Sequence, residues 1–365
     1  MKIPFVDLKA QYQSIKVEID AAIENILTNT SFIGGPVVKE FESNFANYMH
    51  AAHCIGCGNG TDAIEIALEA LDLAPDSEVI VPAMSWISTA ECVTTAGAIP
   101  VFADILPGKH TIDPVDIERK ITNKTRALIP VHFYGRSAEM DEIMAIAKKH
   151  NLKVLEDAAQ AHGTEYKGQR VGTFGDISTF SFYPGKNLGA YGDAGAITTN
   201  DDMLAERCRV ISNHGQVKKH HHIREGRNSR LDTLQAAILD VKLKHIESWT
   251  ESRIEHAKYY NEQLADLPIE LPQFDADHRL VFHVYAILVE DREGVKKKLE
   301  ERGISTQIHY PKSLPELIPY QDRFDADDYP VAKKLGACGL SLPMYAELTR
   351  EQQDYVIEML KEVLV

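Results

Sequence analysis

The sequence predicts an α/β protein with a mainly parallel central sheet, followed by a smaller α+β region. Between about residues 50 and 200, short and almost continuously apolar runs alternate with segments of helical spacing. This alternation indicates βαβ units whose sheet is covered on both faces. A long helical stretch and then a set of shorter mixed elements complete the chain.

The predicted strands of the sheet are rich in valine, isoleucine and leucine. They cover residues 78–82, 99–105, 127–132 and 153–157. The helical segments between them cover residues 88–97, 114–121 and 139–150. Because parallel sheets bind ligands at the carboxyl ends of their strands, the residues that follow each strand are candidates for a site. These candidates are Trp86, residues 132–134 and residues 157–160.

The C-terminal part of the chain has a different pattern. Residues 231–267 predict one or two long helices that lead out of the sheet region. Beyond them, strand-like and helical runs predict a small α+β domain; they cover residues 283–290, 292–303, 304–311 and 339–348. We therefore predict a large domain over residues 1–245 and a small C-terminal domain over residues 246–365.

Composition and charge disfavour several classes of function. The 365 residues are 44% hydrophobic and 25% charged, which is typical of a globular protein. The net charge of −15 disfavours binding to nucleic acids or anionic membranes, because such a field repels phosphates. No apolar run has the length of a signal-peptide core at the N-terminus or of a membrane span elsewhere. We expect a soluble, cytoplasmic protein.

Two features have the residue types of a metal site without its pattern. Cys54 and Cys57 have the spacing of a zinc or redox motif, but the sequence contains no second pair that would complete a zinc site. The five cysteines are too few and too scattered for a disulfide framework. We interpret these two cysteines as the end of a strand that enters a glycine turn. His220, His221 and His222 are adjacent, so their side chains diverge. We expect no metal, and we interpret the histidine run as a basic loop near an anionic ligand.

The stretch GCGNGTDAIEIALEAL, residues 56–71, predicts a glycine turn that leads into a helix. Its apolar residues recur three and four positions apart, so the helix begins near Thr61 or Asp62. The preceding residues, GNG, free the backbone to wrap an anion at the helix N-terminus. A plain glycine turn capped by Thr61 is the alternative.

Two further stretches carry a carboxylate and an amine. Asp157 ends a predicted buried strand, where it could pair with a ligand cation or cap a following helix. In SFYPGKNLGAYGDAGAIT, residues 181–198, Lys186 lies between Gly185 and Gly189, which leave room for the backbone. Apolar surroundings would lower the pKa of this amine, as a Schiff-base former requires. A solvent-facing lysine is the alternative.

The motifs IPFVDLKAQY, GPVVKEFESNFANYM, GNGTDAIEIAL, EDAAQAHG, SFYPGKNLGAYGDAGAI, NHG, GRNSRLDTLQAAIL and IHYP follow one another along nearly the whole chain. In this order they resemble the DegT/DnrJ/EryC1/StrS sugar aminotransferases. The resemblance implies the aspartate-aminotransferase fold, which is fold type I of the enzymes that depend on pyridoxal 5′-phosphate (PLP).

The resemblance also implies roles for residues around PLP. Lys186 would be its covalent anchor and the base that moves a proton during transfer. Asp157 would pair with the ring nitrogen, and Gln160 would contact the 3-hydroxyl. Trp86 would stack on the ring, although a core aromatic is the alternative. The phosphate contacts are expected from Gly60, Thr61, Ser181 and, from the neighbouring subunit of a homodimer, Asn228. Substrate contacts are expected from Tyr183, Lys219, Arg230, His309 and Tyr310.

By the same resemblance, the reaction moves an amino group from L-glutamate to a keto carbon of a nucleotide-linked hexose, while PLP alternates with its amine form (PMP). The lysine loop resembles the branch that acts at C3, with dTDP-3-keto-6-deoxyhexoses as the first expectation. Residues 221–239 also resemble enzymes for UDP-3-keto-N-acetylglucosaminuronic acid, whose carboxylate Arg230 could bind. A 4-keto sugar is a further alternative. The product would serve O-antigen or other surface-glycan synthesis.

Two other classes in this family fit less well. The PLP-dependent sugar 3-dehydrases have histidine in place of the lysine and carry an iron–sulfur cysteine set. Here Lys186 is present, and only Cys338 falls in the C-terminal third. A non-catalytic regulatory protein would not need Lys186, Asp157, Gln160 and Ser181 together. The residues therefore favour an enzyme.

Overall fold

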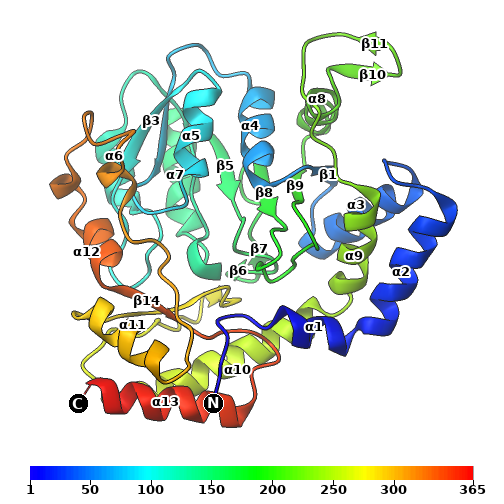
Figure 1. The fold of residues 1–365 in the computed structure, drawn as a ribbon. Coiled ribbons are helices and arrows are strands. Elements are labelled where there is room, and N and C mark those ends of the chain that lie inside the picture. Colours follow the sequence, from blue (N-terminus) through cyan, green and yellow to red (C-terminus); the bar gives the residue numbers. More distant parts are fainter. Residues whose placement is uncertain (365) are drawn as a thin grey trace.

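A seven-stranded sheet forms the centre of the larger part of the molecule in the computed structural model, which describes residues 1–364 (Figure 1). The strands lie in the order β1-β9-β8-β5-β4-β2-β3. Their bounds are β1 His53–Cys57, β2 Glu78–Pro82, β3 Ile99–Ala103, β4 Thr125–Leu128, β5 Lys153–Asp157, β8 Ile177–Ser181 and β9 Gly195–Thr199. Only β9 runs antiparallel to its neighbours, β1 and β8. The predicted mainly parallel α/β sheet is confirmed.

Helices pack around this sheet and extend from it. Those of the sheet region are α3 Pro36–Met49, α4 Gly60–Leu71, α5 Ser88–Thr95, α6 Pro114–Lys120, α7 Met140–His150, α8 Asp202–Ser212 and α9 Thr233–Leu243. The helices α1 Leu8–Ser14 and α2 Lys16–Asn29 precede them, and α2 packs against α9. Short pieces complete this part: β6 Glu165–Tyr166, β7 Gln169–Arg170, β10 Gln216–Lys218, β11 His221–His222 and the 3-10 turn η1 Phe133–Gly135.

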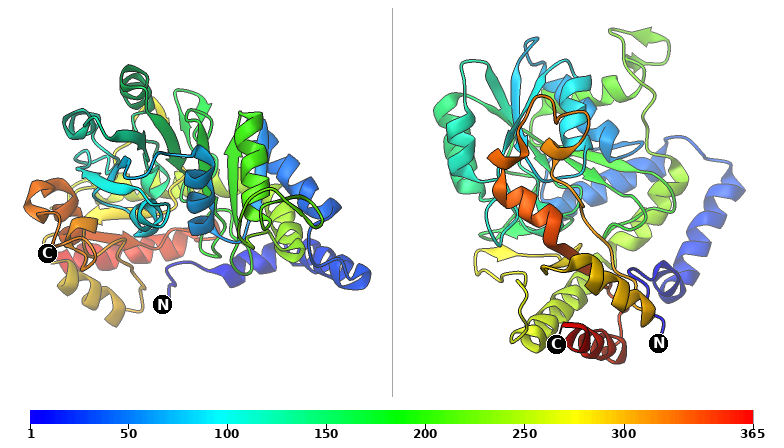
Figure 2. Two further views of the ribbon diagram at one scale, coloured as in Figure 1. Left: turned by 90° about the horizontal axis from the view of Figure 1, so that it is seen from above. Right: turned by 60° about the vertical axis from the view of Figure 1, so that its left-hand side comes forward.

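The C-terminal elements are α10 Ile246–Leu264, β12 His278–Arg279, β13 Tyr285–Leu288, α11 Arg292–Glu301, η2 Leu314–Glu316, η3 Ala326–Asp328, α12 Pro330–Cys338, β14 Gly339–Leu342 and α13 Arg350–Leu364. The helices α10, α11 and α13 lie on one side of the sheet region, together with both ends of the described chain, whereas α12 and the loop before it flank the sheet (Figures 1 and 2). The strands β13 and β14 pair antiparallel. The predicted boundary at residue 245 falls between α9 and α10, and the division into two domains stays a prediction.

The ends of several elements differ from the sequence prediction. The strand expected over residues 127–132 ends at Leu128, because Pro130 has no N–H to donate to the ladder. Residues 304–311 form isolated bridges at Ile304 and Gln307 instead of a continuous strand. Ile304 pairs with Ile3, and Ile3 is buried in the core of the C-terminal elements. The N-terminal end therefore joins a core that the sequence prediction built from C-terminal residues alone.

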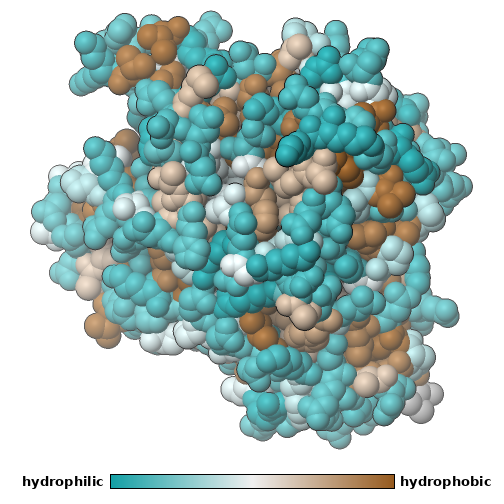
Figure 3. Space-filling view, turned by 180° about the vertical axis from the view of Figure 1, so that it is seen from behind, coloured by the Kyte–Doolittle hydropathy of each residue, from teal (hydrophilic) through white to brown (hydrophobic). Residues whose placement is uncertain are grey.

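The surface is mostly hydrophilic on the face seen from behind, where apolar groups occur in separate small patches (Figure 3). The hairpin of β10 and β11 projects beyond α8 and the sheet (Figure 1). None of the helices in residues 1–364 combines the length and the apolar content that crossing a lipid bilayer requires.

Candidate active site

A cavity of about 660 Å³ contains most of the residues that the sequence singled out. Its wall includes Asp157, the last residue of β5, and Ser181, the last residue of β8, so it lies at the carboxyl ends of these strands. Ten predicted residues line it: Gly60, Thr61, Trp86, Asp157, Gln160, Ser181, Tyr183, Lys186, His309 and Tyr310. The other three predicted residues, Lys219, Asn228 and Arg230, are not part of its lining.

Lys186 lies in a tight loop after β8. Its backbone N–H donates a hydrogen bond to the carbonyl oxygen of Tyr183 at 2.8 Å. A side chain at Gly189 would overlap the carbonyl oxygen of Pro184, so the loop requires glycine there, whereas a Cβ at Gly185 would meet only the Tyr183 ring, at 3.7 Å. Burial lowers the pKa of the Lys186 amine to about 8, against the opposing influence of Asp157. Lys186 is half-buried and its side chain lines the cavity, so the alternative of a solvent-facing lysine is wrong.

Asp157 is a buried carboxylate with two hydrogen bonds. It accepts one from the Thr89 hydroxyl at 2.8 Å and one from the backbone N–H of Ala159 at 3.2 Å. No helix follows it, so the alternative that Asp157 caps a helix is wrong. Burial raises its pKa, because among residues 1–364 it forms no salt bridge that would compensate the lost solvation. A cationic group in the cavity would supply the missing charge.

Sequence reasoning missed the hydroxyl pair that orients Asp157. The Ser85 and Thr89 hydroxyl oxygens lie 2.7 Å apart, and both residues line the cavity. Both come from the stretch PAMSWISTA, which follows β2. Because β2 ends at the same edge of the sheet as β5, the rule that singled out Trp86 also applied to these hydroxyls.

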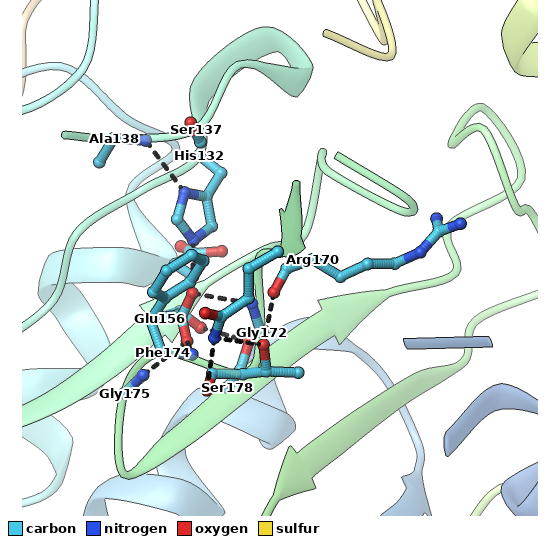
Figure 4. A network of polar contacts seen from close by, with 12 residues as sticks. His132, Ser137, Ala138, Glu156, Arg170, Gly172, Phe174, Gly175 and Ser178 are labelled. Carbon is cyan, nitrogen blue, oxygen red and sulfur yellow. Dashed lines mark hydrogen bonds and ion pairs between the residues drawn. The ribbon is translucent and has the colours of Figure 1, made fainter. Parts of the chain in front are cut away.

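A buried polar network surrounds Glu156, the residue before Asp157 in β5 (Figure 4). The Glu156 carboxylate accepts hydrogen bonds from the backbone N–H groups of Gly172, Phe174 and Gly175, at 2.7, 2.8 and 2.8 Å. His132 lies with Nε2 3.0 Å from Glu156, and its Nδ1 accepts from Ala138 N–H at 3.1 Å, so its proton is on Nε2. Since successive strand residues point to opposite faces, this network fixes the strand end that directs Asp157 into the cavity.

The glycine turn opens α4 beside the end of β8. Asn59 caps the helix by accepting from Asp62 N–H at 2.8 Å, so the alternative of a cap at Thr61 is wrong, and the helix begins at Gly60, just before the predicted start. The first N–H groups of a helix have no acceptor within it, which leaves those of Gly60 and Thr61 for an anion. A Cβ at Gly60 would lie 2.7 Å from that of Ser181, so glycine is needed for this close approach.

The remaining lining residues contribute a side-chain amide and several aromatic rings to the cavity. Gln160 accepts from Tyr134 N–H at 2.8 Å through Oε1, so its NH₂ group faces the Tyr310 hydroxyl, 3.5 Å away. Trp86 is 55% exposed and its ring lies 5.3 Å from that of Tyr310. The alternative that Trp86 is a core aromatic is therefore wrong. Tyr183 is 60% exposed at the cavity rim.

The residues outside the cavity lie on one exposed segment. Lys219 is in the turn of the β10–β11 hairpin, and Arg230, further along the chain, is also exposed. Asn228 lines an open depression of about 890 Å³ that shares no lining residue with the cavity. Between them, Ser229 is buried: its hydroxyl accepts from Gly58 N–H at 3.0 Å and donates to Asp62 at 2.6 Å. This clamp, which sequence reasoning missed, ties the segment to the glycine turn.

The cysteines and histidines do not form a ligand set. Cys57 ends β1 at the glycine turn, as expected, and Cys54 is buried in the same strand. His220, His221 and His222 are exposed in the hairpin. Within the described residues, no group of three histidine, cysteine, aspartate or glutamate side chains is arranged to hold a metal ion.

Comparison with known sequences identifies close relatives. The sequence model of the DegT/DnrJ/EryC1/StrS aminotransferase family matches residues 13–361. A pleiotropic regulatory protein of Geobacillus stearothermophilus is 47% identical, over 99% of this chain and 98% of its own. The dTDP-3-amino-3,4,6-trideoxy-α-D-glucose transaminase of Streptomyces venezuelae is 41% identical (99% and 96%). The UDP-2-acetamido-2-deoxy-3-oxo-D-glucuronate aminotransferase of Pseudomonas aeruginosa is 43% identical (95% and 96%).

The fold also matches solved structures. The chain superposes on DesV from S. venezuelae, crystallised in complex with a ketimine intermediate, with a TM-score of 0.97. The two proteins are 41% identical, and the match covers 99% of this chain and 98% of that one. The aminotransferase fold expected from the sequence is confirmed over its full extent.

Proposed function

The chain belongs to the DegT/DnrJ/EryC1/StrS aminotransferase family, and from this premise we propose that it aminates the C3 keto group of a nucleotide-linked hexose. L-Glutamate is the proposed amino donor, and a dTDP-3-keto-6-deoxyhexose is the proposed acceptor. The observation that carries the proposal is the half-buried amine of Lys186 in one cavity with the buried carboxylate of Asp157.

The cavity residues fit PLP, the cofactor of this family. Asp157 offers a buried negative charge to the ring nitrogen, and Lys186 offers an amine of lowered pKa to the aldehyde. The open N–H groups at the start of α4 and the Ser181 hydroxyl suit the phosphate. When bound, PLP supplies an electron sink that stabilises negative charge on the carbon next to the transferred amino group.

Each residue then has a defined task. Lys186 takes a proton from the donor carbon and gives it to the carbon on the other side of the transferred nitrogen. To accept the proton, its amine must be neutral. Burial increases the neutral fraction of that amine by lowering its pKa to about 8. Asp157 keeps a proton on the ring nitrogen, and the Thr89 hydroxyl holds the carboxylate in place. The NH₂ group of Gln160 faces the cavity as a hydrogen-bond donor, and Trp86 supplies an exposed ring face.

The proposed substrate contacts divide into two sets. Tyr183, His309 and Tyr310 come from the cavity itself. Lys219 and Arg230 come from the exposed segment, as does Asn228, the expected phosphate contact, and we propose that these three residues act in the cavity of a second copy of the chain. A homodimer would then complete each site by adding cations that can bind a diphosphate or a carboxylate. Among the described lining residues of this chain's own cavity, Lys186 is the only lysine or arginine.

The chemistry of the acceptor can be tested directly. Purified enzyme with L-glutamate is offered dTDP- and UDP-linked 3-keto and 4-keto sugars, and the amino product is identified by mass and NMR spectroscopy. We expect turnover of a dTDP-linked 3-keto sugar. Turnover of 4-keto sugars alone would overturn the C3 assignment.

A second candidate substrate is UDP-3-keto-N-acetylglucosaminuronic acid. The exposed guanidinium of Arg230 favours it, because a bidentate pair with the sugar carboxylate suits arginine. A relative of comparable identity acts on a sugar of this kind. In the same assay, preference for the UDP-linked uronate would select this candidate, and the product would still be consistent with surface-glycan synthesis in the cytoplasm.

A further inference from the structure

His283 lines the cavity but has no part in the proposed function. It lies between β12 and β13 and is half-buried. Its Nδ1 is 3.3 Å from Oδ1 of Asn187, the residue that directly follows Lys186. The lysine loop is thus in contact with the C-terminal part of the chain through these two side chains.

The orientation of Asn187 determines which ring nitrogen of His283 carries the proton. The Asn187 amide is buried, and its NH₂ group donates to the carbonyl oxygen of Val281 at 2.9 Å. The reverse orientation would bring two carbonyl oxygens together, so Oδ1 must face His283. An amide oxygen only accepts, and His283 therefore donates from Nδ1–H.

The imidazole of His283 is also neutral. Burial is the main cause and lowers its pKa well below its usual value; Lys186 acts in the same direction whenever its amine carries a proton. The other groups that face it are Arg253, His309 and His162, and each of them also disfavours an imidazolium. A neutral ring with its proton on Nδ1 has a free lone pair on Nε2.

We propose that His283 is a hydrogen-bond acceptor in the active site, whose Nε2 accepts an N–H of the neutral Lys186 amine and is held in that role by Asn187. The residue is not a base in this proposal, because no proton is transferred to it. It orients the lone pair of Lys186 toward the substrate carbon. The proposed role of His283 rests on the proposed function of Lys186, whereas the tautomer of His283 does not.

Two variants distinguish the effect of the hydrogen-bond acceptor at Nε2 from the effect of the ring's shape. In His283→Gln, the side-chain amide reaches the position of Nε2 and can present an oxygen there. In His283→Asn, the shorter amide can still donate to Asn187 but leaves nothing at Nε2. We expect His283→Asn to lower kcat about tenfold, the value of one lost hydrogen bond, with little change in the KM of the sugar. His283→Gln should keep kcat within about threefold of the wild type.

The tautomer can be measured without reference to activity. Long-range ¹H–¹⁵N NMR spectra of the full-length holoenzyme, labelled with ¹⁵N-histidine, distinguish protonated from unprotonated ring nitrogens. The His283 signals are those lost in both variants. We expect an unprotonated Nε2 and a protonated Nδ1 from pH 6 to 8.

The outcomes decide the proposal separately from the function. An Nε2–H tautomer or an imidazolium at pH 7 would overturn it, even if the variants are inactive or unstable. Equal loss of kcat in both variants would also overturn it, because shape would then matter instead of the acceptor. If Lys186→Ala were fully active, the proposed function would fail while the NMR result still stood.

Discussion

The two groups of candidate residues differ in how the chain holds them. Lys186 and Asp157 lie in one cavity, in a loop that needs glycine at residue 189 and at a strand end held by Thr89. Lys219 lies exposed in the hairpin that projects beyond the sheet, and Arg230 lies exposed further along the chain, next to the buried Ser229. The first group is complete within one chain, whereas the second has no cavity of its own. The difference teaches that the amine and carboxylate of the proposed site are built within one chain, whereas the cations proposed for the substrate lie outside that chain's own cavity.

The strongest test of the first group removes the amine. Lys186→Ala should lower the transamination rate by at least about 10³-fold, because positioned acid–base catalysis alone contributes about 10²- to 10⁴-fold. The rate of glutamate-dependent amination and the absorbance of bound cofactor measure the effect. Lys297→Ala, at an exposed lysine of α11, is the matched control and should behave as the wild type. A Lys186→Ala enzyme with normal turnover would contradict the assignment.

The next test removes only a charge. Asp157→Asn keeps the size of the side chain but leaves the ring nitrogen without an anionic partner, and kcat should fall by about 10²-fold. Thermal unfolding should be unchanged or shifted upward, since the native carboxylate is buried with a raised pKa. Loss of stability with unchanged kcat would mean that Asp157 is only a structural residue.

The second group is tested by mixing variants. Arg230→Ala should raise the KM of the sugar about tenfold without changing the melting temperature, because the side chain is exposed. After Lys186→Ala and Arg230→Ala subunits are mixed and exchanged, about a quarter of the sites in a random population would be intact if they are completed across a dimer. At low substrate concentration, activity should rise toward about that fraction of the wild type. Activity equal to the mean of the two parents would show that each subunit acts alone.

The smallest expected effect is a pH dependence. Because the Lys186 pKa is lowered to about 8, its neutral fraction rises as pH increases through that value. The rate at which protein stripped of cofactor binds added PLP covalently should therefore increase about tenfold from pH 7 to 9 and then level off. Borohydride trapping followed by mass spectrometry measures it. A rate that still rises steeply above pH 10 would indicate an ordinary solvated lysine.

The site was predicted well where local sequence determines geometry. The turn before α4, the strand end at Asp157 and the loop at Lys186 follow from glycine positions and apolar runs, whereas most of the ten predicted residues that line the cavity were expected from the family resemblance. Local patterns did not reveal Ser229, which is fixed by contacts to Gly58 and Asp62 in a distant part of the chain. They also misjudged Gly185, where the structure leaves room for a side chain.

The sequence by itself determined the class of the protein, because the hydrophobic period and the order of motifs are properties of neighbouring residues. It indicated the βαβ sheet and the amine, carboxylate and anion site at its edge. Only the tertiary structure decided the lowered pKa of Lys186, the tautomer of His283 and the separation of Arg230 from the cavity. Each of these depends on which side chains exclude water from a group or accept its hydrogen bonds, and those neighbours come from distant parts of the chain.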